Sequence, residues 1–373
     1  MNAIVTITKH GAALGQQLHT VMPESDFFIN AKFAADAPSG RPYPTTVMDL
    51  IADIFPRYDG LIFFISLGAV IRMLAKHLQD KKVDPAVVVV DDRAQFAIAV
   101  LSGHLGGANA LTRQIGELMG CQPVITTASD VGGTIAVDLL GHEFGWTIDA
   151  DSWRNVTKVS AAVVNEEPVG VLQETGESGW WPADKPLPKN IRLYPDLALL
   201  EESDSAAALL ITDRALTLPS PRGRGGEGDA PGLLSKSVVY RPRSLSVGVG
   251  CTRGTSVEAL REAVQRVLRE HRLSPQSVLC LATAELKRTE EGISALAREL
   301  RVPVEYFSQE QLNAAEGQES PSAAQRLLGI KSVSECAAVL AAHADRLVLP
   351  KQVVGMVTVA VARKTFSGIE ERV

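Results

Sequence analysis

LSGHLGGANA, residues 101–110, joins an apolar run to an amphipathic run and decides the fold that this sequence predicts. Ahead of it, Gln95–Leu101 is typical of a strand. Behind it, apolar residues recur at helical spacing as far as Met119, and Gly120 stands where a helix often ends on glycine. The segment therefore predicts a strand, a glycine-rich turn and a helix N-terminus, where free backbone N–H groups favour an anionic ligand.

The same alternation of short strands and helices extends to both sides of this turn. Ala3–Thr8, Leu61–Ile65 and Pro123–Thr127 are predicted strands, with helical segments between them. Val87–Val90 is a run of valines, which is typical of a strand buried on both faces. The pattern predicts an α/β fold, with an N-terminal α/β domain built on a mainly parallel sheet, a small middle α/β region and a separate C-terminal α/β domain.

The domain boundaries follow from composition along the chain of 373 residues, a length that favours more than one domain. We expect the N-terminal domain at 1–130, the middle region at 131–215, a linker rich in Pro, Gly and Arg at 216–243, and the C-terminal domain at 244–373. The linker prediction rests on LTLPSPRGRGGEGDAPGLLSK, residues 216–236. The arginines in and just after it, including Arg241, are interpreted as solvated. In the middle region, Val137–Phe144 is predicted to be helical.

Overall composition excludes several classes of function. The hydrophobic fraction of 46% and the charged fraction of 21% are ordinary for a soluble protein, and a formal net charge of −6 gives no reason to expect a nucleic-acid partner. No apolar run approaches the roughly 20 residues of a membrane span, and the N-terminus has no signal-peptide layout, so we expect a cytoplasmic protein. The four cysteines are isolated in sequence, which predicts reduced thiols and neither a disulfide framework nor a metal site.

Residues of the first glycine-rich turn are the main candidates for chemistry. His104 is a plausible proton-transfer group near neutral pH. Ser102 is a possible nucleophile, but its segment is not GxSxG, and no ordered Ser–Asp–His arrangement is recognisable, which disfavours a serine hydrolase. Asn109 is either a helix cap or a ligand for a carbonyl or carboxylate. Asp130 follows the next strand, at the end where open α/β sheets bind ligands.

A second glycine-rich turn follows a predicted strand in the C-terminal domain. It reads GVGCTRGT, residues 248–255, and lacks the GxxxxGK[ST] pattern of a phosphate-binding loop. Arg253 beside exposed N–H groups would suit a carboxylate, or it is an exposed arginine in a tight turn. TSVE, residues 255–258, predicts a capping box at the start of the next helix. Lys351 follows another strand and is either an anion ligand or a surface residue.

Taken together, several segments resemble the cobalt-precorrin-5A hydrolase family of anaerobic cobalamin biosynthesis. The resemblance covers nearly the whole chain and departs from the family at the linker and at Lys331–Glu335. The segments that carry it are DPAVVVVDD (Asp84–Asp92), LSGHLGGANALTRQIGELMG (Leu101–Gly120), PVITTASD (Pro123–Asp130), VGVGCTRGTS (Val247–Ser256), LATAELKRTEEG (Leu281–Gly292) and LVLPKQVVGMVTVAVAR (Leu347–Arg363).

The resemblance implies a hydrolase that acts on a carbon–carbon bond of a cobalt-tetrapyrrole substrate. Such an enzyme opens a δ-lactone on the contracted ring and releases acetaldehyde, and the cobalt belongs to the substrate, so no protein cofactor or metal is expected. Neighbouring enzymes of the same pathway and a second copy of the chain, as a homodimer, are the macromolecular partners left open. Nucleic acid and membrane are not expected partners.

The chemistry of lactone opening suggests roles for the candidate residues. His104 would be the base, Ser102 and the N–H groups of Gly106 and Gly107 would polarise the carbonyl, and His104 or Asp130 would deprotonate the freed alcohol. The residues expected to bind the substrate are Gly103, Gly106, Gly107, Asn109, Thr126, Thr127, Gly250, Arg253, Gly254, Thr255 and Lys351.

Two other functions compete with this interpretation. One is a non-catalytic carrier of a corrin intermediate, because the C-terminal domain resembles a stand-alone protein of the aerobic pathway. The other is a nucleotide-binding enzyme, suggested by the strand–glycine–helix turns. The absence of a phosphate-loop lysine and of a complete GxGxxG disfavours the second.

Overall fold

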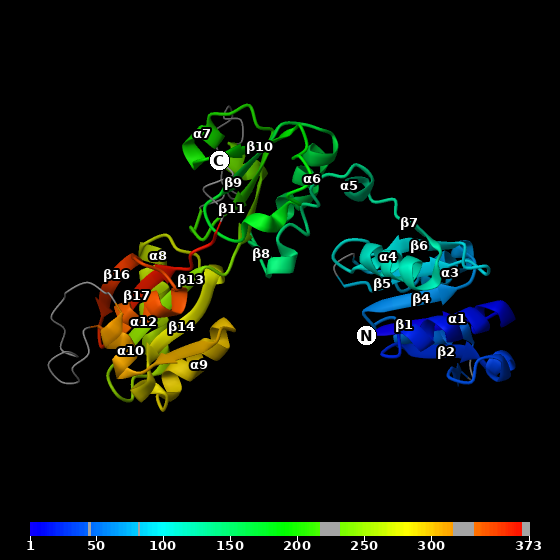
Figure 1. Ribbon diagram of the computed structural model, residues 1–373, viewed down its shortest axis with the longest axis horizontal. Coiled ribbons are helices and arrows are strands. Elements are labelled where there is room, and N and C mark those ends of the chain that lie inside the picture. The colour runs from blue at the N-terminus through cyan, green and yellow to red at the C-terminus, as the bar shows by residue number, and fades with distance from the viewer. Residues whose placement is uncertain (44–45, 81–82, 217–231, 316–331, 368–373) are drawn as a thin grey trace. The chain divides into compact units, whose positions relative to one another are not determined.

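The computed structural model describes residues 1–43, 46–80, 83–216, 232–315 and 332–367 of the chain. The described chain divides into two compact units, Met1–Leu139 and Leu140–Val373 (Figure 1). Of the predicted linker, the structure describes residue 216 and residues 232–243. Residues 217–231 lie outside the described ranges. Among the described residues, no helix combines the length and the apolar character needed to span a bilayer.

The N-terminal unit is a seven-stranded sheet in the order β3-β2-β1-β4-β5-β6-β7. Its neighbouring strands are parallel except for the β5–β6 pair, which is antiparallel, so the predicted mainly parallel sheet is confirmed. The strands are β1 (Asn2–Thr6), β2 (Asp26–Asn30), β3 (Arg41–Tyr43), β4 (Gly60–Phe64), β5 (Ala86–Val90), β6 (Phe96–Leu101) and β7 (Gln122–Val124). The helices are α1 (Lys9–Val21), α2 (Val47–Ile54), α3 (Leu67–Leu74), α4 (Ala108–Met119) and the single turn α5 (Ala128–Val131).

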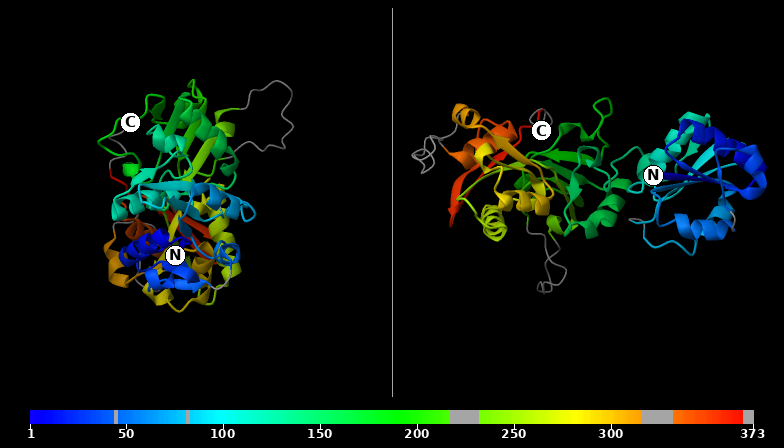
Figure 2. Two further views of the ribbon diagram at one scale, coloured as in Figure 1. Left: turned by 90° about the vertical axis from the view of Figure 1, so that its right-hand side faces the viewer. Right: turned by 90° about the horizontal axis from the view of Figure 1, so that it is seen from below.

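Helices cover both faces of this sheet (Figure 2). Side chains alternate along a strand, so Val88 and Val90 of β5 pack in the core beneath α1 and α4, while Val87 and Val89 pack in the core beneath α2 and α3. All five residues of β5 are buried, which confirms the strand predicted from the run of valines. The segments that follow β6 and β7 carry the residues of the candidate site.

The second unit contains two five-stranded sheets, ordered β10-β9-β11-β12-β8 and β15-β14-β13-β17-β16. The first is parallel except for β8, and in the second β17 runs antiparallel to both of its neighbours. Its strands are β8 (Thr147–Ile148), β9 (Val169–Gln173), β10 (Ile191–Tyr194), β11 (Ala207–Ile211), β12 (Ser237–Arg241), β13 (Leu245–Cys251), β14 (Val278–Ala284), β15 (Val304–Phe307), β16 (Leu347–Val354) and β17 (Val357–Arg363). Its α-helices are α6 (Val156–Val164), α7 (Leu197–Glu201), α8 (Val257–Glu270), α9 (Glu291–Leu300), α10 (Gln309–Ala314) and α12 (Val333–Ala342).

Three local predictions in this part of the chain are wrong. Ser237–Arg241, expected in the linker, is the fully buried strand β12. The expected helix at Val137–Phe144 is an irregular segment that ends in a 3₁₀ turn, His142–Phe144. The capping box expected at residues 255–258 is absent from α8, whose N-cap is Ser256 with its hydroxyl accepting from the N–H of Ala259.

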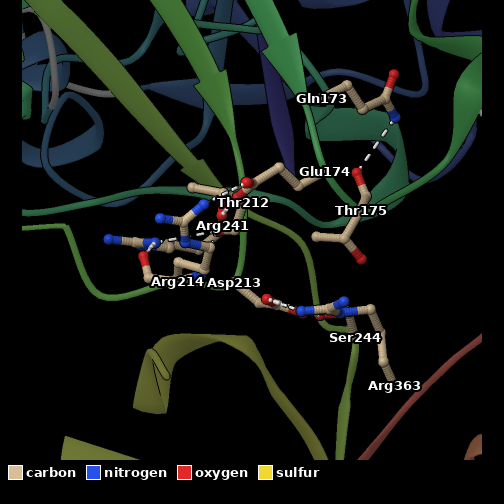
Figure 3. A network of polar contacts seen from close by, with 9 residues as sticks. All are labelled: Gln173, Glu174, Thr175, Thr212, Asp213, Arg214, Arg241, Ser244 and Arg363. Atoms are coloured by element: carbon tan, nitrogen blue, oxygen red, sulfur yellow. Dashed lines mark hydrogen bonds and ion pairs between the residues drawn. The ribbon is translucent and has the colours of Figure 1, made fainter. Parts of the chain in front are cut away.

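A buried carboxylate, that of Asp213, joins the two sheets of the second unit (Figure 3). Asp213, which follows β11 and is fully buried, accepts two hydrogen bonds from the Arg363 guanidinium at 2.6 and 2.7 Å. The Ser244 hydroxyl donates to the same carboxylate at 2.8 Å. Arg241 is also buried, and it binds Asp149 through two nitrogens at 2.9 and 2.7 Å. The prediction that Arg241 is solvated is therefore wrong, because a partner far away in the sequence neutralises its charge.

Candidate active site in the N-terminal unit

The turn between β6 and α4 is tightly folded on itself. Ser102 has φ of +54° and Gly107, the N-cap of α4, has φ of +86°, a left-handed conformation that glycine adopts without steric cost. A Cβ on Gly106 would lie 2.3 Å from the Cβ of Ser102, so only glycine fits this packing. The turn thereby places the His104 side chain over the region beyond β7, where α5 begins.

The backbone N–H groups expected to be free at the N-terminus of α4 mostly donate to carbonyl groups within the turn. The N–H of Gly107 donates to the carbonyl of His104 at 2.8 Å. The N–H groups of the first two helical residues, Ala108 and Asn109, donate to the carbonyls of Ser102 and Gly103. The expectation of open donors is therefore wrong for these three groups. The Ser102 hydroxyl is also engaged, because it donates to the carbonyl of Asp84 at 2.8 Å.

His104 lies at the centre of a polar cluster built from three segments. Its Nδ1 is 2.9 Å from Oδ1 of Asp138, in the loop after α5. Its Nε2 is 3.1 Å from Oδ2 of Asp130 and 3.0 Å from Oγ of Ser129, both on α5. The side chains of His104 and Asp138 are 15% and 14% exposed, so their interaction is weakly screened by water. Both ring nitrogens therefore have a fixed partner.

Asp130 is in turn held by two neighbours on α4. Its Oδ1 pairs with the Arg113 guanidinium, and its Oδ2 accepts from Nδ2 of Asn109 at 2.9 Å. The same amide nitrogen donates to the Thr127 hydroxyl at 2.9 Å. Asn109 is buried, and its Oδ1 has no hydrogen-bond partner within the described residues. Asn109 thus acts as a positioning group between α4 and α5, rather than as the N-cap of α4.

The cluster changes the acidity of its members. The hydrogen bond with Asp138 raises the pKa of His104 above its ordinary value; burial opposes this shift, and the charges of Asp138 and Asp130 support it. Burial alone would raise the pKa of Asp130, but the hydrogen bonds from Arg113 and His104 outweigh it, so the pKa of this carboxyl is lowered. The arrangement is an imidazole whose protonated form is favoured, beside a carboxylate whose ionised form is favoured.

The other sequence-predicted residues lie at separate places. Thr126 is exposed and precedes α5. Gly250 is part of β13, where a Cβ would lie 2.5 Å from the Thr358 hydroxyl, so close strand packing requires glycine there. Lys351 lies on β16 and is half-buried, and its backbone N–H donates to Oε1 of Glu335 at 3.0 Å.

Arg253, Gly254 and Thr255 do come together, in the second unit. They line a cavity of about 510 Å³ between the N-termini of α8 and α9. Glu290, the N-cap of α9, also lines it and accepts a hydrogen bond from the Gly254 N–H at 2.8 Å. These residues belong to the second unit, whereas His104 belongs to the first.

Two residues of the His104 cluster carry no sequence signal that would assign them a role. Asp138 falls in a segment predicted to be helical, and Arg113 is an exposed residue of the amphipathic helix α4. The cluster involves no metal-binding arrangement: within the described ranges, no group of three or more His, Cys, Asp or Glu residues is placed to hold an ion.

Three family models match consecutive parts of the chain. They are cobalamin synthesis G N-terminal at residues 49–130, cobalamin biosynthesis central region at residues 135–242, and cobalamin synthesis G C-terminus at residues 245–362. The chain belongs to the cobalamin synthesis G family. The resemblance seen in the sequence is thereby confirmed, and the three family regions follow the predicted order of α/β domains.

Relatives of this cobalamin synthesis G family member carry an enzyme name. Cobalt-precorrin-5A hydrolase of Priestia megaterium is 42% identical, with 96% of this chain and 94% of the relative covered. The protein of the same name from Salmonella typhimurium is 31% identical, with 92% and 93% covered. Among solved structures, CobE, a protein from the cobalamin biosynthetic pathway, is 32% identical over 32% of this chain and 92% of its own, with a TM-score of 0.30.

Proposed function

We propose that this chain is a hydrolase that converts cobalt-precorrin-5A to cobalt-precorrin-5B and acetaldehyde in anaerobic cobalamin biosynthesis. The observation that carries the proposal is the 42% identity to a cobalt-precorrin-5A hydrolase along almost the full length of both chains. The cluster around His104 supports it, because a largely buried imidazole between two carboxylates is suited to moving protons in a hydrolysis.

The reaction has two parts whose atoms balance with one water. In the first, an oxygen nucleophile adds to the carbonyl carbon of the lactone, and the C–O bond within the lactone ring breaks. This leaves the ring A acetate as a carboxylate and an alcohol on the extruded carbon. In the second, the alcohol loses its proton and the bond between that carbon and the macrocycle breaks, with the electron pair passing to the ring. The extruded carbon leaves with its methyl group as acetaldehyde. This second part makes the enzyme a hydrolase that acts on a carbon–carbon bond.

Proton transfer in both parts is assigned to His104. In the neutral ring, Nδ1–H donates to Asp138, so the lone pair on Nε2 accepts a proton during attack on the carbonyl. The resulting imidazolium is stabilised by Asp138 and Asp130 and returns the proton to the departing alkoxide. Asp130, ionised and held by Arg113, is the second candidate for deprotonating the alcohol.

Substrate binding requires partners for acetate and propionate carboxylates. Arg253 with Gly254 and Thr255 at their cavity, and Lys351 on β16, remain the proposed carboxylate-binding residues in the second unit. The cobalt ion is part of the substrate, so the chain is proposed to contribute binding and proton transfer without a cofactor of its own.

Replacement of His104 tests the assignment. We expect His104→Gln to reduce acetaldehyde release from cobalt-precorrin-5A on the order of 10²- to 10⁴-fold, the usual contribution of a general acid–base group. The matched control is His19→Gln in α1, outside the cluster. Near-normal turnover of His104→Gln would remove His104 from proton transfer while leaving the overall reaction in place.

A further inference from the structure

Three side chains of the N-terminal unit are joined by hydrogen bonds, and the acid–base role proposed above gives no part to the first of them, Ser129. The Ser129 Oγ lies 3.0 Å from Nε2 of His104, and Nδ1 of the same ring lies 2.9 Å from Oδ1 of Asp138. Ser129 is buried at 7% exposure, on the single turn α5. A hydroxyl, an imidazole and a carboxylate joined in this order form the arrangement that activates a serine as a nucleophile.

We propose that Ser129 is the nucleophile of lactone opening and that the reaction proceeds through an acyl-enzyme. This inference rests on the proposed function, since it names the group that attacks the lactone carbonyl. It differs from direct attack by water in predicting a covalent ester between Ser129 and the acetate arm of the substrate. Water then enters in a second step.

The steps balance without any additional reactant. The Ser129 Oγ–H proton passes to Nε2 of His104 as Oγ bonds to the lactone carbonyl carbon. The tetrahedral intermediate collapses, the ring C–O bond breaks, and the imidazolium gives its proton to the departing alkoxide. A water then attacks the ester, His104 accepts its proton and returns it to the Ser129 oxygen. The acetate arm is released as a carboxylic acid that ionises in water.

Nε2 of His104 lies within reach of both Asp130 and Ser129, and the protonation state of the ring decides which of the two it bonds. In the imidazolium, Nε2–H donates to the Asp130 carboxylate at 3.1 Å. In the neutral ring, Nε2 is an acceptor, and the Ser129 hydroxyl is the donor within reach. Asp130 has other partners in this state, because Arg113 and Asn109 hold its two oxygens. The nucleophilic state is therefore the one above the raised pKa of His104.

Other hydroxyls near the turn are engaged differently. Ser102 donates to the Asp84 carbonyl, and no contact joins it to the ring of His104. Thr127 accepts from the Asn109 amide. Ser129 is thus the hydroxyl that the fold aims at the imidazole, although residues 102 and 104 are much closer in sequence.

A serine-directed probe tests the inference on the full chain without any substrate. Diisopropyl fluorophosphate is incubated with the protein, and the intact mass and the labelled peptide are measured. We expect one phosphoryl adduct on Ser129 in the unaltered chain. Labelling should fall to background in Ser129→Ala and in His104→Gln. The control variant is Ser66→Ala, which removes a serine at the start of α3 that makes no side-chain cap.

The substrate experiment separates this inference from the proposed function. Acetaldehyde release by Ser129→Ala should fall on the order of 10³-fold or more. With hydroxylamine present, the unaltered chain should yield a hydroxamate on the acetate arm above the level seen with Ser129→Ala. No adduct on Ser129, together with acetaldehyde release by Ser129→Ala at the control rate, would overturn the acyl-enzyme and leave water as the nucleophile. No acetaldehyde from the unaltered chain would instead overturn the proposed function.

Discussion

Replacing Asp138 by asparagine tests whether this carboxylate positions His104 for proton transfer or only stabilises the fold. The substitution keeps the size of the side chain but removes the charge that faces Nδ1 of His104 at 2.9 Å. A hydrogen bond to a charged group contributes about 1.5–3 kcal/mol, and both side chains are largely shielded from water, so little of it is screened. At about 1.4 kcal/mol per factor of ten, the loss corresponds to a rate reduction of about 10- to 150-fold.

The pH dependence gives a readout that structural damage does not produce. The neutral ring of His104 is the active form, so kcat/KM rises with pH through the pKa of this residue. The bond with Asp138 is the largest cause of the raised pKa, and burial acts in the opposite direction. Asp138→Asn should therefore lower the pKa of His104 and move the acidic limb of the profile to lower pH.

The assay is acetaldehyde release from cobalt-precorrin-5A across a pH series, with melting temperature as a check on folding. Glu117→Gln is the matched control, because it removes the same charge from an exposed position on α4. An unchanged rate and an unmoved acidic limb in Asp138→Asn would refute the assignment of Asp138 as the partner that sets the state of His104.

Three further predictions concern stability and the geometry of the turn. The pKa of His104 is raised in the folded state, so its stabilising contribution is complete below about pH 6.5 and is lost as pH rises through that raised pKa. His104→Gln should therefore flatten this part of a plot of melting temperature against pH. Asp213→Asn should cost about 3 kcal/mol in urea unfolding, because Arg363 then lacks its buried counter-charge; a change within error would show that water replaces it. Gly106→Ala should destabilise by about 1–3 kcal/mol and reduce turnover, because the added Cβ lies 2.3 Å from that of Ser102, and wild-type values for both measurements would contradict the described turn.

Local pattern was sufficient for the cores and for the strand–turn–helix unit around His104. Val87–Val90 and Leu61–Ile65 are apolar runs whose burial on both faces leaves little alternative to a central strand. Gly120 also ends α4 in a left-handed conformation, as its position after the amphipathic run predicts. Such features depend on neighbours in sequence, so the sequence alone reveals them.

The partners of His104 depend on contacts across longer distances and were not predictable in the same way. Ser129 and Asp138 lie 25 and 34 residues from His104, and no motif links the three. Asp138 also lies within Val137–Phe144, whose apolar spacing predicts a helix and therefore gives no reason to assign this carboxylate a role. A Cβ on Gly141 would lie 1.9 Å from the Trp146 ring, and Gly141 has φ of +72°, so the left-handed glycine and the close approach of Trp146 keep the end of this segment out of a helix.

The buried strand β12 shows the same limit. Composition extended the linker to residue 243, but Ser237–Arg241 inserts beside β11 and pairs with it in parallel. The arginine at its end is buried because Asp149, 92 residues away, neutralises it. Neither the pairing nor the ion pair leaves a local trace in the sequence.

The most direct test of the central claim is a single incubation of the full chain with cobalt-precorrin-5A, with mass analysis of the tetrapyrrole and trapping of any aldehyde. The account predicts a product that has gained one water and lost a two-carbon aldehyde, together with trapped acetaldehyde, and it predicts that His104→Gln gives neither at the same rate. An unchanged substrate mass with tight binding would contradict the account and identify the chain as a carrier.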